Sequence, residues 1–306
     1  MKPFLEVEKD RKEYHLNSFK NTVHRSSLLI PKIKNNNTYI SFLNHFLLKR
    51  NYKNVVIKIT AYNNKGESGE SRTFEINELK VYCFFIEKLL GDQFSCYQIE
   101  FFSSNNLFIP FPAVIINHVS KFSINTVHSF NRILNDSKED DLINKVHLKE
   151  ASIDFALSKS RNTFFIFQSG LLAIKEKSIE IIIEKSNETR QPKLVKIPIT
   201  IPKMSIRKFN LNEVLKDLDL GSDISPGEYT LRILQPKQEM FYGRLLVGIE
   251  EVDNGSFTAN HSYYDNSTYE EYFDSKSSFR TFAYFKNSTN QIRIYPVMSS
   301  GQGIFS

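Results

Sequence analysis

The chain has 306 residues, of which 41% are hydrophobic, so it can bury cores in two domains of ordinary size. Its net charge of +6 comes from 40 basic and 34 acidic residues that are mixed along the chain. Nucleic-acid-binding proteins usually concentrate positive charge on one stripe or tail, so this pattern argues against a nucleic-acid partner. The N-terminus lacks the apolar segment of a signal peptide, and no run approaches the roughly 18 apolar residues of a membrane span. These features predict a soluble, cytoplasmic protein.

The aromatic content favours strands over helices. The chain contains 26 Phe and 14 Tyr but no Trp, and aromatic side chains fit the pleated, half-buried surface of a sheet. The two cysteines, Cys83 and Cys96, have neither the pattern of a disulfide framework nor the spacing of a metal site. Cys83 lies within the apolar run 81–85, which predicts a small buried thiol.

Changes in polarity divide the chain into five predicted parts. These are an N-terminal arm (1–35), a first repeat (36–135), a polar linker (136–150), a second repeat (151–265) and a C-terminal extension (266–306). The linker is acidic, but it lacks the alternating ligands and the central Gly of an EF-hand loop. The extension contains two strand-like segments, which we expect to complete an existing sheet because a lone hairpin is marginal in water.

Each repeat contains one strictly alternating segment. The residues that share one face are Ile57, Ile59 and Ala61 in the first repeat and Ile179, Ile181 and Ile183 in the second. A period of two predicts half-buried strands. Each repeat then has one helix-compatible segment, 77–91 and 212–221, which begins at an Asn and ends at a Gly.

The ends of the two repeats match in spacing and in chemistry. Tyr97 opens a strand-like segment and His128 follows it by 31 residues, while Tyr229 and His261 are separated by 32 residues. Each histidine precedes a Ser and an aromatic residue, so the match predicts an internal duplication. A repeat of 90–98 residues has the size of one β-sandwich. We therefore expect an all-β fold of two tandem antiparallel β-sandwiches, jelly-roll or immunoglobulin-like, with short helical turns.

The duplicated histidines have a structural and a functional interpretation. On a strand, His128 shares a face with Thr126, and His261 shares a face with Ala259. An imidazole copied onto an apolar face can satisfy backbone groups at the end of a sheet. Alternatively, the two imidazoles converge between the repeats and bind a divalent metal or an anionic ligand. A soluble catalytic metal site usually has three protein ligands, and the third could come from Asp265, Glu270, Glu271 or His118.

Four further residues are candidates for ligand binding. Arg132 and Arg280 can each grip a carboxylate or phosphate through the guanidinium fork, although a solvated surface position is the simpler interpretation. Tyr263 and Tyr264 begin a tyrosine-rich segment that can stack on a sugar or pack on the sandwich.

Three classes of function remain, since the sequence lacks the motifs of nucleotide-binding, hydrolase and zinc-protease sites. The first is a non-catalytic binding protein that engages a glycan or a protein through its loops and sheet edges. The second is a metal- or histidine-dependent enzyme with a site at the interface of the repeats. The third is a self-assembling homo-oligomer with the architecture of a double jelly-roll capsid protein. We favour the first because it requires no motif.

Overall fold

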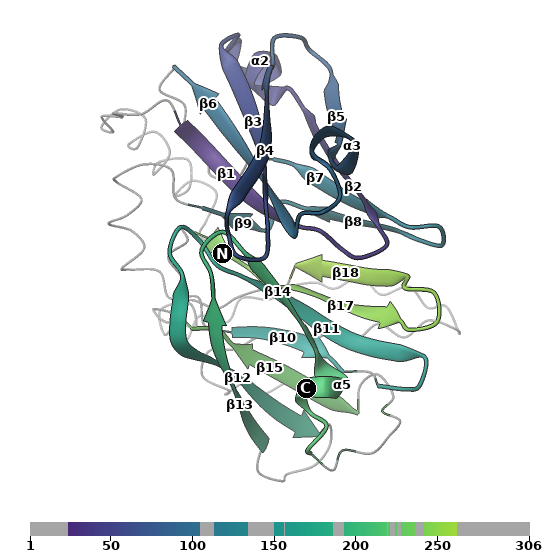
Figure 1. Cartoon of the computed structure of the whole chain (residues 1–306). Helices are drawn as coiled ribbons and strands as arrows, with labels where there is room; N and C mark the ends of the chain where they lie inside the picture. The colour runs from purple at the N-terminus through teal and green to yellow at the C-terminus, as the bar shows by residue number, and fades with distance from the viewer. Residues whose placement is uncertain are drawn as a thin grey trace, which may run out of the picture.

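The computed structural model describes residues 24–104, 113–133, 150–155, 157–185, 193–218, 220, 224, 228–236 and 242–261. Over these residues the chain forms small antiparallel sheets with a few short helices (Figure 1). The prediction of an all-β fold is therefore confirmed. No helix within the described ranges is long and apolar enough to cross a membrane.

The first half of the described chain, residues 24–133, builds two four-stranded sheets. In spatial order the first sheet, here called the β1 sheet, contains β1 (His24–Pro31), β6 (Cys96–Ser103), β3 (Val55–Tyr62) and β4 (Ser68–Glu75). The second, the β2 sheet, contains β5 (Val81–Phe85), β2 (Asn37–Leu43), β7 (Ile115–Val119) and β8 (Ile124–His128). The helices α2 (His45–Arg50) and α3 (Ile86–Leu90) and the short strand β9 (Asn131–Arg132) complete this half. Alternation places Ile57 and Ile59 of β3 in one core with Ile40 and Ile116 of the β2 sheet.

The second half, residues 150–261, also builds two four-stranded sheets. The β10 sheet contains β10 (Glu150–Asp154), β15 (Tyr229–Leu234), β12 (Ile174–Lys185) and β13 (Lys193–Ile201). The β11 sheet contains β14 (Ile206–Asn210), β11 (Arg161–Gln168), β17 (Leu246–Glu251) and β18 (Phe257–His261). Helix α5 (Leu211–Val214) follows β14, and β16 (Tyr242–Gly243) pairs with β9 of the first half. Ile181 of β12 and Phe165 of β11 belong to the core of this half.

The two halves share one strand order. When β9 and β16 are set aside, each half has one sheet in the order first, sixth, third, fourth and another in the order fifth, second, seventh, eighth. His128 and His261 each end the eighth strand, opposite Ile115 and Leu246 respectively. An internal duplication predicts this correspondence. Small four-stranded sheets are also the units of a β-propeller, and the arrangement seen here resembles one as much as it resembles two tandem sandwiches.

Two local predictions were wrong, and both concern the segment after β4. Residues 81–85 were expected to be helical, but they form strand β5, which pairs with β2, and only Ile86–Leu90 are helical. The period of two in β5 turns Tyr82 and Phe84 toward the core. Cys83 therefore lies on the opposite face and is exposed, whereas Cys96 is the buried thiol.

Strand β11 at the middle of its sheet is buried on both faces, and this joins the halves. One face, with Phe165 and Phe167, packs in the core of the second half. The other face, with Phe164, Ile166 and Leu246, belongs to the core of the first half. All five side chains are no more than 1% exposed. The second half therefore inserts one sheet face into the hydrophobic core of the first.

Polar and backbone contacts reinforce this junction. The buried amide of Asn131 accepts a hydrogen bond from the Leu29 N–H at 2.7 Å and donates to the Leu29 carbonyl at 2.6 Å and to the Gln168 side chain at 3.3 Å. Gly66, in the turn between β3 and β4, has φ +73°, and a Cβ there would lie 1.8 Å from the carbonyl oxygen of Lys203. A glycine is required at this position because the turn of one half touches the backbone of the other.

His118 of β7 is a buried imidazole beside this junction. Its side chain is fully buried, and its ring centroid lies 5.8 Å from that of Phe257 in the second half. Within the described residues, neither ring nitrogen has a hydrogen-bond partner. Burial disfavours the charged imidazolium and lowers the pKa of His118 to about 4.

This burial predicts a pH-dependent loss of stability. Below pH ~6.5 the unfolded state takes up a proton at His118 while the folded state does not, so stability is lost as the pH falls toward 4. Between pH 7 and pH 5, the free energy of unfolding of the wild type should fall by about 2 kcal/mol more than that of His118→Leu. Urea denaturation at both pH values measures this difference. Asn117→Leu, on the other face of β7, should keep the wild-type pH dependence, and equal pH dependence of His118→Leu and wild type would contradict the burial argument.

Candidate functional site

The two edge strands β8 and β18 bring the duplicated histidines together. These strands come from different halves and lie side by side (Figure 1). The backbone N–H of Ala259 in β18 donates a 2.7 Å hydrogen bond to the side-chain oxygen of Asn125 in β8. Because His128 and His261 are the last residues of these strands, their side chains meet at one end of the junction.

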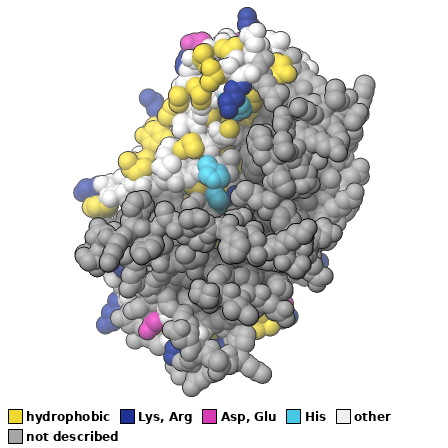
Figure 2. All heavy atoms as spheres, turned by 180° about the vertical axis from the view of Figure 1, so that it is seen from behind, with side chains coloured by type: hydrophobic (Ala, Val, Ile, Leu, Met, Phe, Trp, Pro, Cys, Tyr) yellow, Lys and Arg dark blue, Asp and Glu magenta, His cyan; other side chains and the backbone are white. Residues whose placement is uncertain are grey.

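The two imidazoles are in direct contact. Their Nε2 atoms are 2.7 Å apart, the ring centroids are 4.4 Å apart and the ring planes are inclined by 66°. His128 is exposed and His261 is half-buried. Figure 2 shows histidine side chains at the surface of the molecule, next to a band of hydrophobic side chains. The structure therefore brings His128 and His261 together. The functional interpretation of the sequence required this convergence.

Hydrogen bonds at both ends of the pair favour one assignment of the proton on each ring. The Arg244 guanidinium can only donate, so the Nδ1 of His261, 3.4 Å away, accepts, and the Nε2 of His261 carries the proton. That proton is shared with the Nε2 of His128, whose Nδ1–H then donates to the carbonyl oxygen of Ser129 at 2.9 Å. In this arrangement a directional chain of hydrogen bonds runs from Arg244 through both rings to Ser129.

Both Nε2 atoms are suited to hold one additional atom between them. Zinc–nitrogen bonds of about 2.0–2.1 Å in a tetrahedral site separate two ligand nitrogens by about 3.3 Å. Opening the 2.7 Å contact by roughly half an ångström would create that gap. Within the described part of the chain, no group of three or more His, Cys, Asp or Glu side chains forms a metal site. The described residues therefore supply two metal ligands, His128 and His261.

The other residues expected at a site are placed differently or lie outside the described residues. Arg132 is fully buried in β9, so the interpretation of a solvated surface arginine is wrong for this residue. Tyr263, Tyr264, Glu270 and Arg280 lie outside the described ranges, and their roles stay predictions. Sequence reasoning missed Arg244, because its contact with His261 depends on how strand β18 folds back beside β17.

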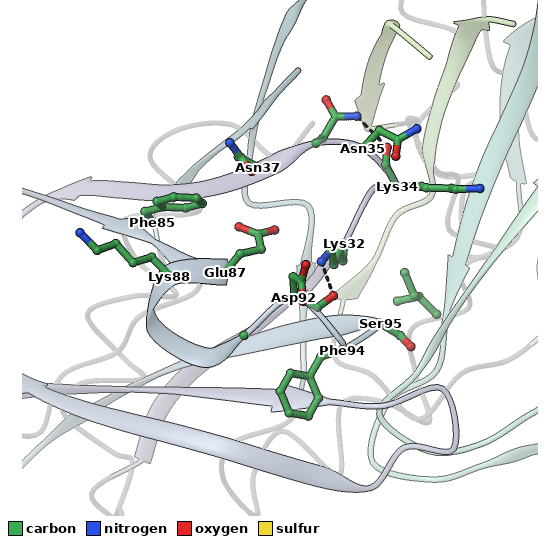
Figure 3. A pocket seen from close by; sticks show the side chains of 13 residues that line it. Lys32, Lys34, Asn35, Asn37, Phe85, Glu87, Lys88, Asp92, Phe94 and Ser95 are labelled. Atoms are coloured by element: carbon green, nitrogen blue, oxygen red, sulfur yellow. Dashed lines mark hydrogen bonds between the residues drawn. The ribbon is translucent and has the colours of Figure 1, made fainter. Parts of the chain in front are cut away.

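The structure also contains a hollow whose lining includes neither His128 nor His261. Nothing in the sequence pattern predicted it. It has a volume of about 1010 Å³, and Figure 3 shows Lys32, Lys34 and Lys88 around it together with Glu87 and Asp92. The Nζ of Lys32 donates to the backbone carbonyl of Asp92, and Glu87 accepts a 2.8 Å hydrogen bond from the Thr38 N–H. Its charged groups thus serve in part to hold the walls, and they come from separate segments that share no motif.

Comparisons with known proteins identify no family. No family model and no curated protein matches the chain. Among solved structures, a calcium-binding mutant of Bacteroides uniformis β-glucuronidase 2 matches with 9% identity and a TM-score of 0.17. The same enzyme covalently bound to cyclophellitol-6-carboxylate aziridine matches with 10% identity and a TM-score of 0.16. Each match covers 82% of this chain and 28% of the enzyme, so the chain spans little more than a quarter of that length. Similarity this low indicates neither fold nor activity.

The contact between the imidazoles predicts measurable coupling between the two halves. In a double-mutant cycle of His128→Ala and His261→Ala, we expect a coupling free energy of about 1 kcal/mol, the usual net value of one hydrogen bond. Urea denaturation of the four proteins measures it. His45→Ala combined with His128→Ala should be additive to within about 0.5 kcal/mol, because His45 lies in α2 and contacts Phe46. Zero coupling between His128 and His261 would show that the rings do not meet.

Proposed function

We propose that this protein is a non-catalytic binding protein built from two related antiparallel β-sandwiches, with a ligand held between them by His128 and His261. The identical strand order of the halves supports the tandem architecture. Two large cores support it too, because each is lined by both sheets of one half. The proposal rests on one observation, the 2.7 Å approach of two Nε2 atoms from equivalent strands.

The ligand that fits this pair best is a divalent transition metal ion. Neutral imidazole is a preferred ligand of Zn²⁺, Cu²⁺ and Ni²⁺. The exposed ring of His128 gives a metal access from solvent. Two protein ligands leave the other coordination positions to water or to a group on a bound partner, which suits binding, whereas catalytic zinc usually has three protein ligands. The enzyme alternative requires a third ligand, for which Glu270 stays a candidate.

Metal binding must displace the proton that the two rings share. When His261 donates its Nε2 lone pair to a metal, its remaining proton sits on Nδ1, where the N–H of Arg244 now points. Arg244 therefore competes with the metal, because its hydrogen bond holds His261 in the tautomer that cannot bind. An anionic ligand would depend on Arg244 in the opposite way, since the guanidinium would attract it.

Isothermal titration calorimetry with ZnCl₂ and with NiCl₂ tests the site. The wild type should bind one ion per chain, and His128→Ala and His261→Ala should each lower the affinity at least tenfold. His45→Ala serves as the matched control and should bind as the wild type does. Equal affinity in wild type and both alanine variants would refute the metal site.

Arg244→Met separates a metal ligand from an anionic one. For a metal, the affinity of this variant should rise severalfold, because the His261 Nδ1 can then carry the proton without facing a donor. For an anion, probed with inorganic phosphate, the variant should instead bind more weakly than the wild type. Weaker Zn²⁺ binding together with a loss of phosphate binding would overturn the proposal in favour of an anion site.

A further inference from the structure

The face of the β2 sheet that points away from the core is uncharged. Its side chains are Leu43, Ser41, Tyr39 and Asn37 on β2, Val81, Cys83 and Phe85 on β5, Ile115, Asn117 and Val119 on β7, and Ile124, Thr126 and His128 on β8. Ile124 is 70% exposed and Val81 is 62% exposed. Figure 2 shows a band of exposed hydrophobic side chains on this side of the molecule. Such contiguous apolar surface usually marks an interaction site.

Charged residues do occur on the outer faces of other sheets. On the β1 sheet, Lys58 lies opposite Glu100 across the β3–β6 pair. On the β10 sheet, Lys196 and Glu180 form an ion pair at 2.7 Å. The uncharged surface is therefore specific to the β2 sheet, and composition alone does not explain it.

The equivalent face in the second half is already used for packing. Strand order and register match Tyr39 with Phe164, Ile115 with Leu246, and Ile124 with Phe257. The three residues of the second half are at most 3% exposed and belong to the core of the first half. In the second half this face of the repeat therefore packs against the neighbouring repeat.

The surface that receives this face is also present in both halves. In the first half it includes the inward side of β8, where Asn125 accepts the hydrogen bond from the Ala259 N–H and Val127 is buried. Register matches Asn125 with Thr258 and Val127 with Asn260 on β18 of the second half. Both of these counterparts are exposed. The second half therefore has an open receiving edge, as the first half has an open face.

We propose that a second copy of this chain covers the uncharged face of the β2 sheet with the receiving edge of its own second half. The contact would repeat, between chains, the packing that joins the two halves within one chain. It uses two different surfaces of the protein, so it is heterologous and continues either into a closed ring or into an open filament. The contact itself requires no ion, but the covered face includes His128, one of the two proposed metal ligands.

Sedimentation velocity over a range of protein concentrations tests the association. The mass-averaged sedimentation coefficient of the wild type should rise with concentration, and Ile124→Lys should remain monomeric because it places a charge in the contact. Ile124 is mostly exposed, so the variant should keep the circular dichroism spectrum and the Tm of the wild type. Leu172→Lys, at a residue 59% exposed outside this face, should associate as the wild type does. A monomeric wild type, or unchanged association of Ile124→Lys, would overturn the proposal.

The exposed thiol of Cys83 gives an independent readout of the same face. Its reaction with a maleimide should slow as the wild-type concentration rises, whereas in Ile124→Lys it should stay fast. Cys96 is buried, which raises its pKa to about 12, so it should not contribute to the reaction. A Cys83 rate that does not depend on concentration in associating wild type would place the contact elsewhere and overturn the proposal.

Mixing two variants tests whether the contact is head-to-tail. Ile124→Lys has a damaged face and an intact edge, and Thr258→Lys has an intact face and a damaged edge. Each should be monomeric alone, and an equimolar mixture should form a dimer that does not grow further. A mixture that stays monomeric would refute the heterologous arrangement, and association of either variant alone would show that the contact pairs identical surfaces.

Discussion

The insertion of the β11 sheet into the core of the first half is the contact on which the rest of the structure depends. Phe164, Ile166 and Leu246 are removed almost completely from solvent by it. Burial of one such side chain stabilises a fold by about 1.5–3 kcal/mol. This packing fixes the second half against the first, and it brings the edge strand β18 beside the edge strand β8. The meeting of His128 and His261 is a consequence of that placement.

The duplication accounts for both the proposed ligand site and the proposed association surface. Two copies of one repeat present the same face and the same edge, and within one chain only one face can meet one edge. The histidines end equivalent strands, so they meet where the copies touch. One face, on the first half, and one edge, on the second half, remain without a partner, which is why a further copy can satisfy them. The proposed ligand site and the proposed association surface therefore share one structural origin.

The sequence predicted the strands and the repeat well, because both follow from local periodicity and spacing. The alternation at Ile57 and Ile181 places these residues in the two cores, and the spacing of His128 and His261 corresponds to equivalent positions in the sheets. The convergence of the histidines could only be posed as a question, because it depends on which repeat faces meet. Arg244 could not be found, since it belongs to no motif. The exposure of Cys83 was missed because an apolar run was interpreted as wholly buried, although a strand turns alternate residues outward.

The most direct test of this account is a long-range ¹H–¹⁵N correlation spectrum of the histidine rings, combined with nuclear Overhauser effects between them. The account predicts that His261 carries its proton on Nε2 and His128 on Nδ1, and that protons of the two rings show cross-relaxation. His128→Ala and His261→Ala assign the signals. Rings that show averaged tautomers and no cross-relaxation would contradict the packing of the two halves on which the site depends.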